Sequence, residues 1–158
     1  MKRYSICMLA VVVSLLMFTS CSGGTDNPLI GTWECDLQQN GMKGINILTF
    51  NEDGTLNLYV NSSLEKPFFR MEASTVCPYT FEDNTIIYTV DDSKTEYKQM
   101  ELEGVSPDDM QRQIDFAKQK GQKREEVLTE VVIDGDVMTA MSQDATGRNK
   151  RITFTKVK

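Results

Sequence analysis

Apolar and polar residues alternate along most of the chain after Leu29, which is typical of β-strands with one face in a core. In the first such run, Thr32–Leu37, residues Trp33, Cys35 and Leu37 share one side. Similar runs follow at 46–50, 55–61, 68–75, 77–82, 86–90, 96–102, 127–133, 137–141 and 151–157. Turn-forming segments such as 51–54 separate these runs, and such short turns are typical of β-hairpins. The sequence therefore predicts an all-β domain of about 8–10 antiparallel strands, closed as a barrel or layered as a sandwich.

One segment has a helical pattern instead. Ser106 is a favourable N-cap, Pro107 suits the first helical position, and Gly121 suits the residue after the last turn. The apolar stripe consists of Met110, Ile114 and Ala117. We expect one inserted α-helix at about 106–120, packed outside a barrel or across its open end.

The first 20 residues have the features of an export signal. Lys2 and Arg3 precede an apolar stretch at 6–18, which is shorter than the roughly 20 residues that span a bilayer. The stretch ends at Phe18-Thr19-Ser20-Cys21, which resembles a bacterial lipoprotein signal with small residues before the Cys. The resemblance implies cleavage after residue 20 and lipidation of Cys21. Residues 21–28 are then a flexible, lipidated tether.

The lipid anchor indicates a location. Several acyl chains on Cys21, at about 0.8 kcal/mol per buried CH₂, hold a domain firmly to a membrane. Ser22 after the Cys does not resemble an inner-membrane retention signal, so the outer membrane is expected. The tether carries only one acidic residue, Asp26, which favours the periplasmic side, with surface display as the alternative.

Charge and composition exclude several functions. The chain has 17 basic and 23 acidic residues, and loss of Lys2 and Arg3 with the signal makes it more acidic, which argues against binding nucleic acid. Histidine is absent, which excludes Ser-His and Cys-His nucleophiles and zinc sites that contain His. Asp108 and Asp109 suit a helix start, and the other acidic pairs suit turns. We therefore expect neither an enzyme nor a metal or cofactor site.

Four cysteines have different expected fates. Cys7 leaves with the signal and Cys21 takes the lipid, whereas Cys35 and Cys77 remain on apolar strand faces. In an oxidising compartment the remaining pair suits a disulfide, but two buried free thiols fit the pattern equally.

Two motifs carry a family resemblance. The segment Leu29-Ile30-Gly31-Thr32-Trp33 and the hairpin 48–56 together resemble the lipocalin-like domain of many Bacteroidetes lipoproteins. The resemblance implies an up-and-down barrel over 29–158 in which Gly31 and Trp33 close one end. It also implies a basic residue of the last strand over the Trp ring, for which Arg151 is the candidate and Arg148 the rival.

The expected function is binding. Flexible Met side chains suit both irregular cores and adaptable apolar pockets. The candidate pocket residues are Met71, Met100, Met138 and Tyr79. One hypothesis is a barrel that binds a small hydrophobic ligand or an envelope protein. The alternative is a filled barrel that acts through protein–protein interaction or as an inhibitor, and an interior cavity distinguishes the two.

Overall fold

The computed structural model describes residues 27–39, 41–143 and 147–158. The predicted export signal, the lipidation site Cys21 and most of the predicted tether lie outside these residues. The strands are β1 (Gly31–Gln39), β2 (Met42–Phe50), β3 (Thr55–Leu64), β4 (Phe69–Glu82), β5 (Thr85–Asp91), β6 (Glu96–Leu102), β7 (Lys123–Asp134), β8 (Val137–Gln143) and β9 (Asn149–Lys156). A short 3-10 helix, η1 (Asp92–Lys94), precedes β6, and α1 (Pro107–Lys120) follows it.

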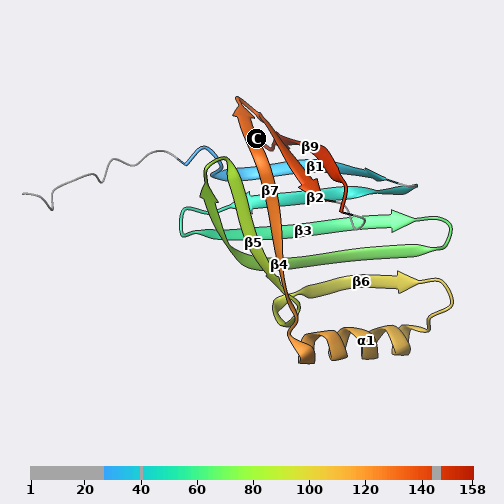
Figure 1. Ribbon diagram of the computed structural model, residues 1–158. Coiled ribbons are helices and arrows are strands. Elements are labelled where there is room, and N and C mark those ends of the chain that lie inside the picture. Colours follow the sequence, from blue (N-terminus) through green and yellow to red (C-terminus); the bar gives the residue numbers. More distant parts are fainter. Residues whose placement is uncertain (1–26, 40, 144–146) are drawn as a thin grey trace, which may run out of the picture.

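Eight of these strands form a closed antiparallel barrel. Each of β1–β5 and β7–β9 pairs with the next barrel strand along the chain, and β1 pairs with β9 at Trp33↔Lys156 and Glu34↔Thr155. The remaining strand, β6, extends the sheet from the first half of β4 (Figure 1). The predicted all-β, lipocalin-like up-and-down barrel with one inserted helix is confirmed.

The long strand β4 replaces two predicted strands. Its residues 69–74 pair with β6 and its residues 79–82 pair with β5, along the same edge. Pro78, which lacks an N–H, lies between these two stretches, where neither β5 nor β6 pairs with β4. Because β5 and β6 diverge there, the barrel wall is incomplete beside residues 75–78 of β4.

The residues at its two ends set the start and the end of α1. The Ser106 hydroxyl accepts a hydrogen bond from the Asp109 N–H at 3.2 Å, and Gly121 has a left-handed φ of 56° that ends the last turn. Met110 and Ile114 are its buried residues. The helix lies beside β6, outside the eight-stranded barrel (Figure 1), as one of the two predicted placements requires.

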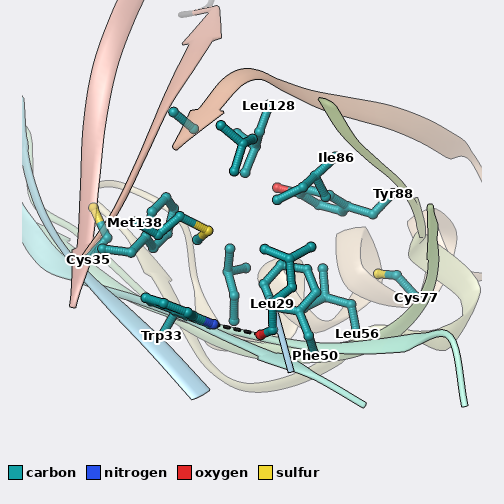
Figure 2. Packing of buried hydrophobic residues seen from close by; sticks show 14 of the residues in the cluster. Leu29, Trp33, Cys35, Phe50, Leu56, Cys77, Ile86, Tyr88, Leu128 and Met138 are labelled. Carbon is teal, nitrogen blue, oxygen red and sulfur yellow. Dashed lines mark hydrogen bonds between the residues drawn. The ribbon is translucent and has the colours of Figure 1, made fainter. Parts of the chain in front are cut away.

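The core draws on every strand of the closed barrel. Every barrel strand contributes a buried side chain, namely Trp33, Phe50, Leu56, Cys77, Ile86, Leu128, Met138 and Phe154 (Figure 2). All members of this cluster come from residues 29–154. A sheet that closes on itself around its own core is a self-contained folding unit.

Candidate ligand-binding cavity

One end of the barrel is plugged by the chain segment that enters it. Trp33 is fully buried, and its Nε1–H donates to the backbone oxygen of fully buried Leu29 at 2.7 Å (Figure 2). Asn27 Oδ1 accepts from the Leu29 N–H at 3.0 Å, and Asn27 Nδ2 donates to the Tyr79 hydroxyl at 3.1 Å. Residues 27–30 therefore fold across this end and close it.

The closure of this end explains the Gly31-x-Trp33 motif, because both motif residues contact Lys156. The ammonium group of Lys156 lies 5.1 Å from the centroid of the Trp33 ring, within cation–π range. Gly31 has a φ of 122°, and a Cβ at this position would lie 2.9 Å from Lys156 Cε. The backbone conformation therefore favours glycine, and a side chain here would also displace the flexible end of Lys156.

The expected basic residue over Trp33 was therefore the wrong one. Arg151 instead forms an ion pair with Glu130 at 3.6 Å, and its side chain is 60% exposed. Strand alternation explains this, because Ile152 and Phe154 face the interior and Lys156 continues their side of β9. Arg151 belongs to the outward side, and the alternation already visible in the sequence could have excluded it.

The opposite end of the barrel encloses a cavity of about 370 Å³. Residues of all eight barrel strands and of β6 line it. The apolar lining consists mainly of Leu37, Leu58, Val60, Met71, Ala73, Val90 and Ile152. The polar lining includes Asn46, Thr75, Tyr88, Tyr97, Arg124, Glu126 and Lys150. We call this space the calyx; its wall is apolar with separate polar groups.

The two tyrosines of the calyx are held in the neutral form. Burial raises the pKa of Tyr88, and the carboxylate of Glu126, its direct partner on β7, raises it further. Burial and the charge of Asp92 likewise raise the pKa of Tyr97. The phenol groups therefore remain hydrogen-bonding groups without charge at neutral pH.

Asn46 and Thr75 line the calyx, but Asn46 Oδ1 and Thr75 Oγ1 have almost no accessible surface in it. The Thr75 residue as a whole is only 7% exposed. Burial raises the pKa of the Cys77 thiol, and a hydrogen bond with the Thr75 side chain partly opposes this effect. The two oxygens therefore belong to the packed wall and not to the surface that faces the open space.

The four predicted pocket residues do not all line one pocket. Met71 lines the calyx, whereas Met100 lies in a groove between β6 and α1. Met138 is fully buried in the core, and Tyr79 packs edge-on against Phe50 near the plugged end, with ring centroids 4.9 Å apart. All four lie on strands, but the sequence pattern does not reveal how far along the barrel Met138 and Tyr79 lie. It also does not reveal that Met100, the register partner of Met71, lies on a strand outside the closed barrel.

Sequence reasoning missed Arg124 and Glu126, because the predicted strand began at Val127. The structure starts β7 at Lys123, and both residues lie on the same side as buried Leu128. Arg124 and Glu126 lie four and two residues before Leu128, and this even spacing could have placed them on its side of the strand. Because both residues are charged, the pattern did not resemble an inward-facing strand side.

Cys35 and Cys77 are free, buried thiols, so the disulfide alternative does not describe this structure. The strand register explains why. Cys35 aligns through β2 and β3 with Ala73 on β4, four residues before Cys77. Three strand spacings of about 4.8 Å each separate β1 from β4, and Figure 2 shows the two sulfurs on opposite sides of the core. Burial raises the pKa of both thiols.

The chain matches no protein-family model, and no curated protein matches it either. In the part of the chain that the structure describes, no helix has the length and apolar character needed to cross a bilayer. Over the same residues, no three His, Cys, Asp or Glu side chains gather in a way that could hold a metal ion.

Proposed function

We propose that this chain is a lipid-anchored, lipocalin-like binding protein that takes a small, largely apolar ligand into the calyx. The observation that carries the proposal is the unfilled open end of the barrel. Its volume of about 370 Å³ falls in the usual range for ligand pockets, about 300–1,000 Å³. It also exceeds the roughly 150 Å³ of an engineered apolar cavity that binds benzene.

The calyx favours this function over a filled barrel that acts only through its surface. Side chains pack the plugged end completely, but they leave space beside Leu58, Val60 and Met71. The proposed role is binding, in which the polar groups of the calyx serve as hydrogen-bonding and charged positions.

The anchor sets an orientation for this function. A tether from Cys21 reaches the barrel at Asn27 and Leu29, which belong to the plugged end. The calyx therefore opens away from the membrane in the proposed arrangement. On the periplasmic side of the outer membrane, the ligand would exchange with the aqueous compartment rather than with the bilayer.

Binding can be tested with the barrel domain, residues 27–158, and the apolar fluorophore N-phenyl-1-naphthylamine. We expect saturable fluorescence enhancement at one site. Ala73→Leu should weaken it by narrowing the calyx, whereas Val76→Leu, on the exposed face of the same strand, should leave it unchanged. Absence of binding, or equal binding by both variants, contradicts the proposal.

The anchor has its own test. In a bacterial host with lipoprotein processing, the full-length chain should fractionate with the outer membrane. Cys21→Ser should remove its lipid label and release it from the membrane fraction. A Cys21→Ser protein that remains membrane-bound contradicts the anchor but leaves the calyx binding proposal in place.

A further inference from the structure

The barrel closes over only a short pairing between β1 and β9. The last residue pair on the calyx side is Glu34↔Thr155. Beyond it, β1 continues to Gln39 and β9 extends back to Asn149. Over this length β1 remains paired with β2, and β9 remains paired with β8. Within the described residues, each of the two strands therefore has one edge here without a neighbouring strand. We call the gap between these two edges the open seam.

A groove of about 420 Å³ lies in the open seam. Its lining includes three consecutive residues of β1, 34–36, and four consecutive residues of β9, 150–153. One face of a strand contributes only every second residue, because side chains alternate between the two faces. The consecutive lining therefore shows that the strand edges, with their backbone groups, border the groove. Lys150 and Ile152 also line the calyx, so the groove adjoins it.

The backbone of β1 directs polar groups into this groove. The Thr32 carbonyl oxygen accepts from the Val157 N–H at 2.8 Å, which shows that the Thr32 backbone faces β9. Alternate residues of a regular antiparallel strand point their N–H and C=O groups toward the same neighbour. The register of β1 with β2 is unbroken, so this alternation continues and the backbone groups of Asp36 and Gln38 point into the open seam.

The Cys35 thiol is a partial substitute for the missing strand. Its Sγ lies 3.5 Å from the Asp36 carbonyl oxygen, and the backbone of Thr153 also forms a hydrogen bond with it. A thiol is both a weak donor and a weak acceptor, so it satisfies these backbone groups poorly. The amide groups of an added strand make stronger hydrogen bonds at the same positions.

The charges beside the groove indicate the side chains of a matching strand. Glu34 and Asp36 lie on the outward side of β1, and neither forms an ion pair within the part of the chain that the structure describes. Across the groove, Arg151 is already paired with Glu130. Basic side chains on the outward face of an added strand would lie beside the two free carboxylates. Its inward side chains would face the apolar wall of the calyx near Leu37.

We propose that the open seam binds an extended peptide segment of a partner protein. The segment adds to the free edge of β1, antiparallel as β9 is, with basic residues outward and apolar residues toward the calyx. Strand addition obtains affinity from main-chain hydrogen bonds and specificity from alternate side chains. An extended peptide supplies donors and acceptors at the spacing of the β1 edge. The inference goes beyond the proposed function, because it needs no small ligand in the calyx.

The test uses the barrel domain, residues 27–158, and the blocked peptide acetyl-Lys-Val-Lys-Val-Lys-amide. A matched peptide carries N-methyl groups on its three lysine amides, which face β1 in the antiparallel arrangement and then cannot donate. Isothermal titration calorimetry should show one-to-one binding of the unmodified peptide. The N-methylated peptide should bind at least about tenfold more weakly. An analogue with Glu in place of each Lys should bind severalfold more weakly.

Amide hydrogen exchange locates the bound peptide. Binding should slow the exchange of the Asp36 and Gln38 amides, which face the open seam. The double variant Glu34→Gln with Asp36→Asn should bind the basic peptide severalfold more weakly. The control variant Glu52→Gln with Asp83→Asn loses the same charge in two exposed turns and should bind it as wild type does. Circular dichroism confirms that both variants are folded before binding is compared.

Several outcomes overturn the inference. One is absence of binding by the basic peptide, and another is equal binding of the N-methylated peptide, because general attraction to an acidic protein needs no backbone pairing. Protection of the Asp36 and Gln38 amides in the free protein is a third. Protection that grows with protein concentration assigns the edge to a second copy, and constant protection assigns it to the chain itself. Binding of N-phenyl-1-naphthylamine tests the calyx separately, so the two proposals fail independently.

Discussion

The two ends of this barrel are built from the same strands but are packed differently. At the plugged end Trp33, Phe50 and Met138 are essentially inaccessible, whereas at the calyx end Leu58 and Met71 line open space. One difference is the entering segment, in which Leu29 fills the plugged end and holds Trp33 by a hydrogen bond. The other is the divergence of β5 and β6 from each other beside residues 75–78 of β4. The comparison shows that alternation decides which residues face inward but not which of them are covered.

The largest expected effect is a difference in stability between variants of two leucines that are register partners. Leu48 on β2 is fully buried, while its partner Leu58 on β3 lines the calyx. Leu48→Ala should lower the free energy of unfolding by about 3 kcal/mol, because it opens a new cavity in close-packed core. Leu58→Ala only enlarges an existing space and should cost about 1 kcal/mol. Urea unfolding of both variants measures this, and equal losses would remove the packing distinction between the ends.

The reverse change tests the same contrast by adding volume. Ala140 is fully buried in the core, and Ala73 lines the calyx. Ala140→Leu should cost about 1–3 kcal/mol by overpacking, whereas Ala73→Leu should cost less than about 1 kcal/mol. Thermal unfolding of the two variants provides the measurement. A large loss for Ala73→Leu would show that its side of the calyx is already filled.

The closure of the plugged end predicts a smaller effect. Lys156→Met removes the cation over the Trp33 ring and should destabilise the barrel by about 1 kcal/mol. Arg151→Met is the matched control on the same strand and should change stability by less than about 0.5 kcal/mol, because its ion pair is exposed. Chemical unfolding at low and high salt distinguishes them, and a larger effect for Arg151→Met would reverse their roles.

The smallest predicted effect concerns pH at the calyx. The pKa of Tyr88 is raised by burial, so the folded state disfavours its phenolate. An unfolded tyrosine ionises near pH 10, at about its ordinary pKa. Stability is therefore unaffected by Tyr88 below that pH and is lost as the pH rises above it. Tyr88→Phe should lose less stability than wild type between about pH 9 and 11, and identical losses would contradict the buried neutral phenol.

Much of the fold was predictable because it depends on local order along the chain. The strand alternation and the Ser106 and Gly121 ends of the helix operate within a few residues. The Gly31-x-Trp33 motif is recognisable locally, although both residues also contact Lys156 on β9. The residue over Trp33 was also predictable from the sequence, because Lys156 and not Arg151 continues the inward side of β9. Applying alternation strictly to the last strand would have identified it.

Strand β7 contains a feature that the local sequence order does not predict. Both Leu128 and Val131 are buried, although strict alternation places them on opposite sides. A bulge makes this possible: Glu130 adopts a positive φ of 51°, and the pairing with β8 shifts between Thr129 and Val132. Val132 is 57% exposed as a result. Pairing with the neighbouring strands decides such a shift, and the β7 sequence alone does not reveal it.

The amino-acid order by itself determined that this protein is built of alternating strands with one capped helix, because these features arise from contacts between near neighbours. Closure of the strands into a barrel depends on the pairing of β1 with β9, which lie far apart in the sequence. Only the tertiary structure decided which inward residues meet a partner across the barrel. It buried Met138, left Met71 beside open space, and kept Cys35 and Cys77 apart. The reason is geometric: the depth of a side chain in a closed barrel depends on strand register and on the segments that cover each end.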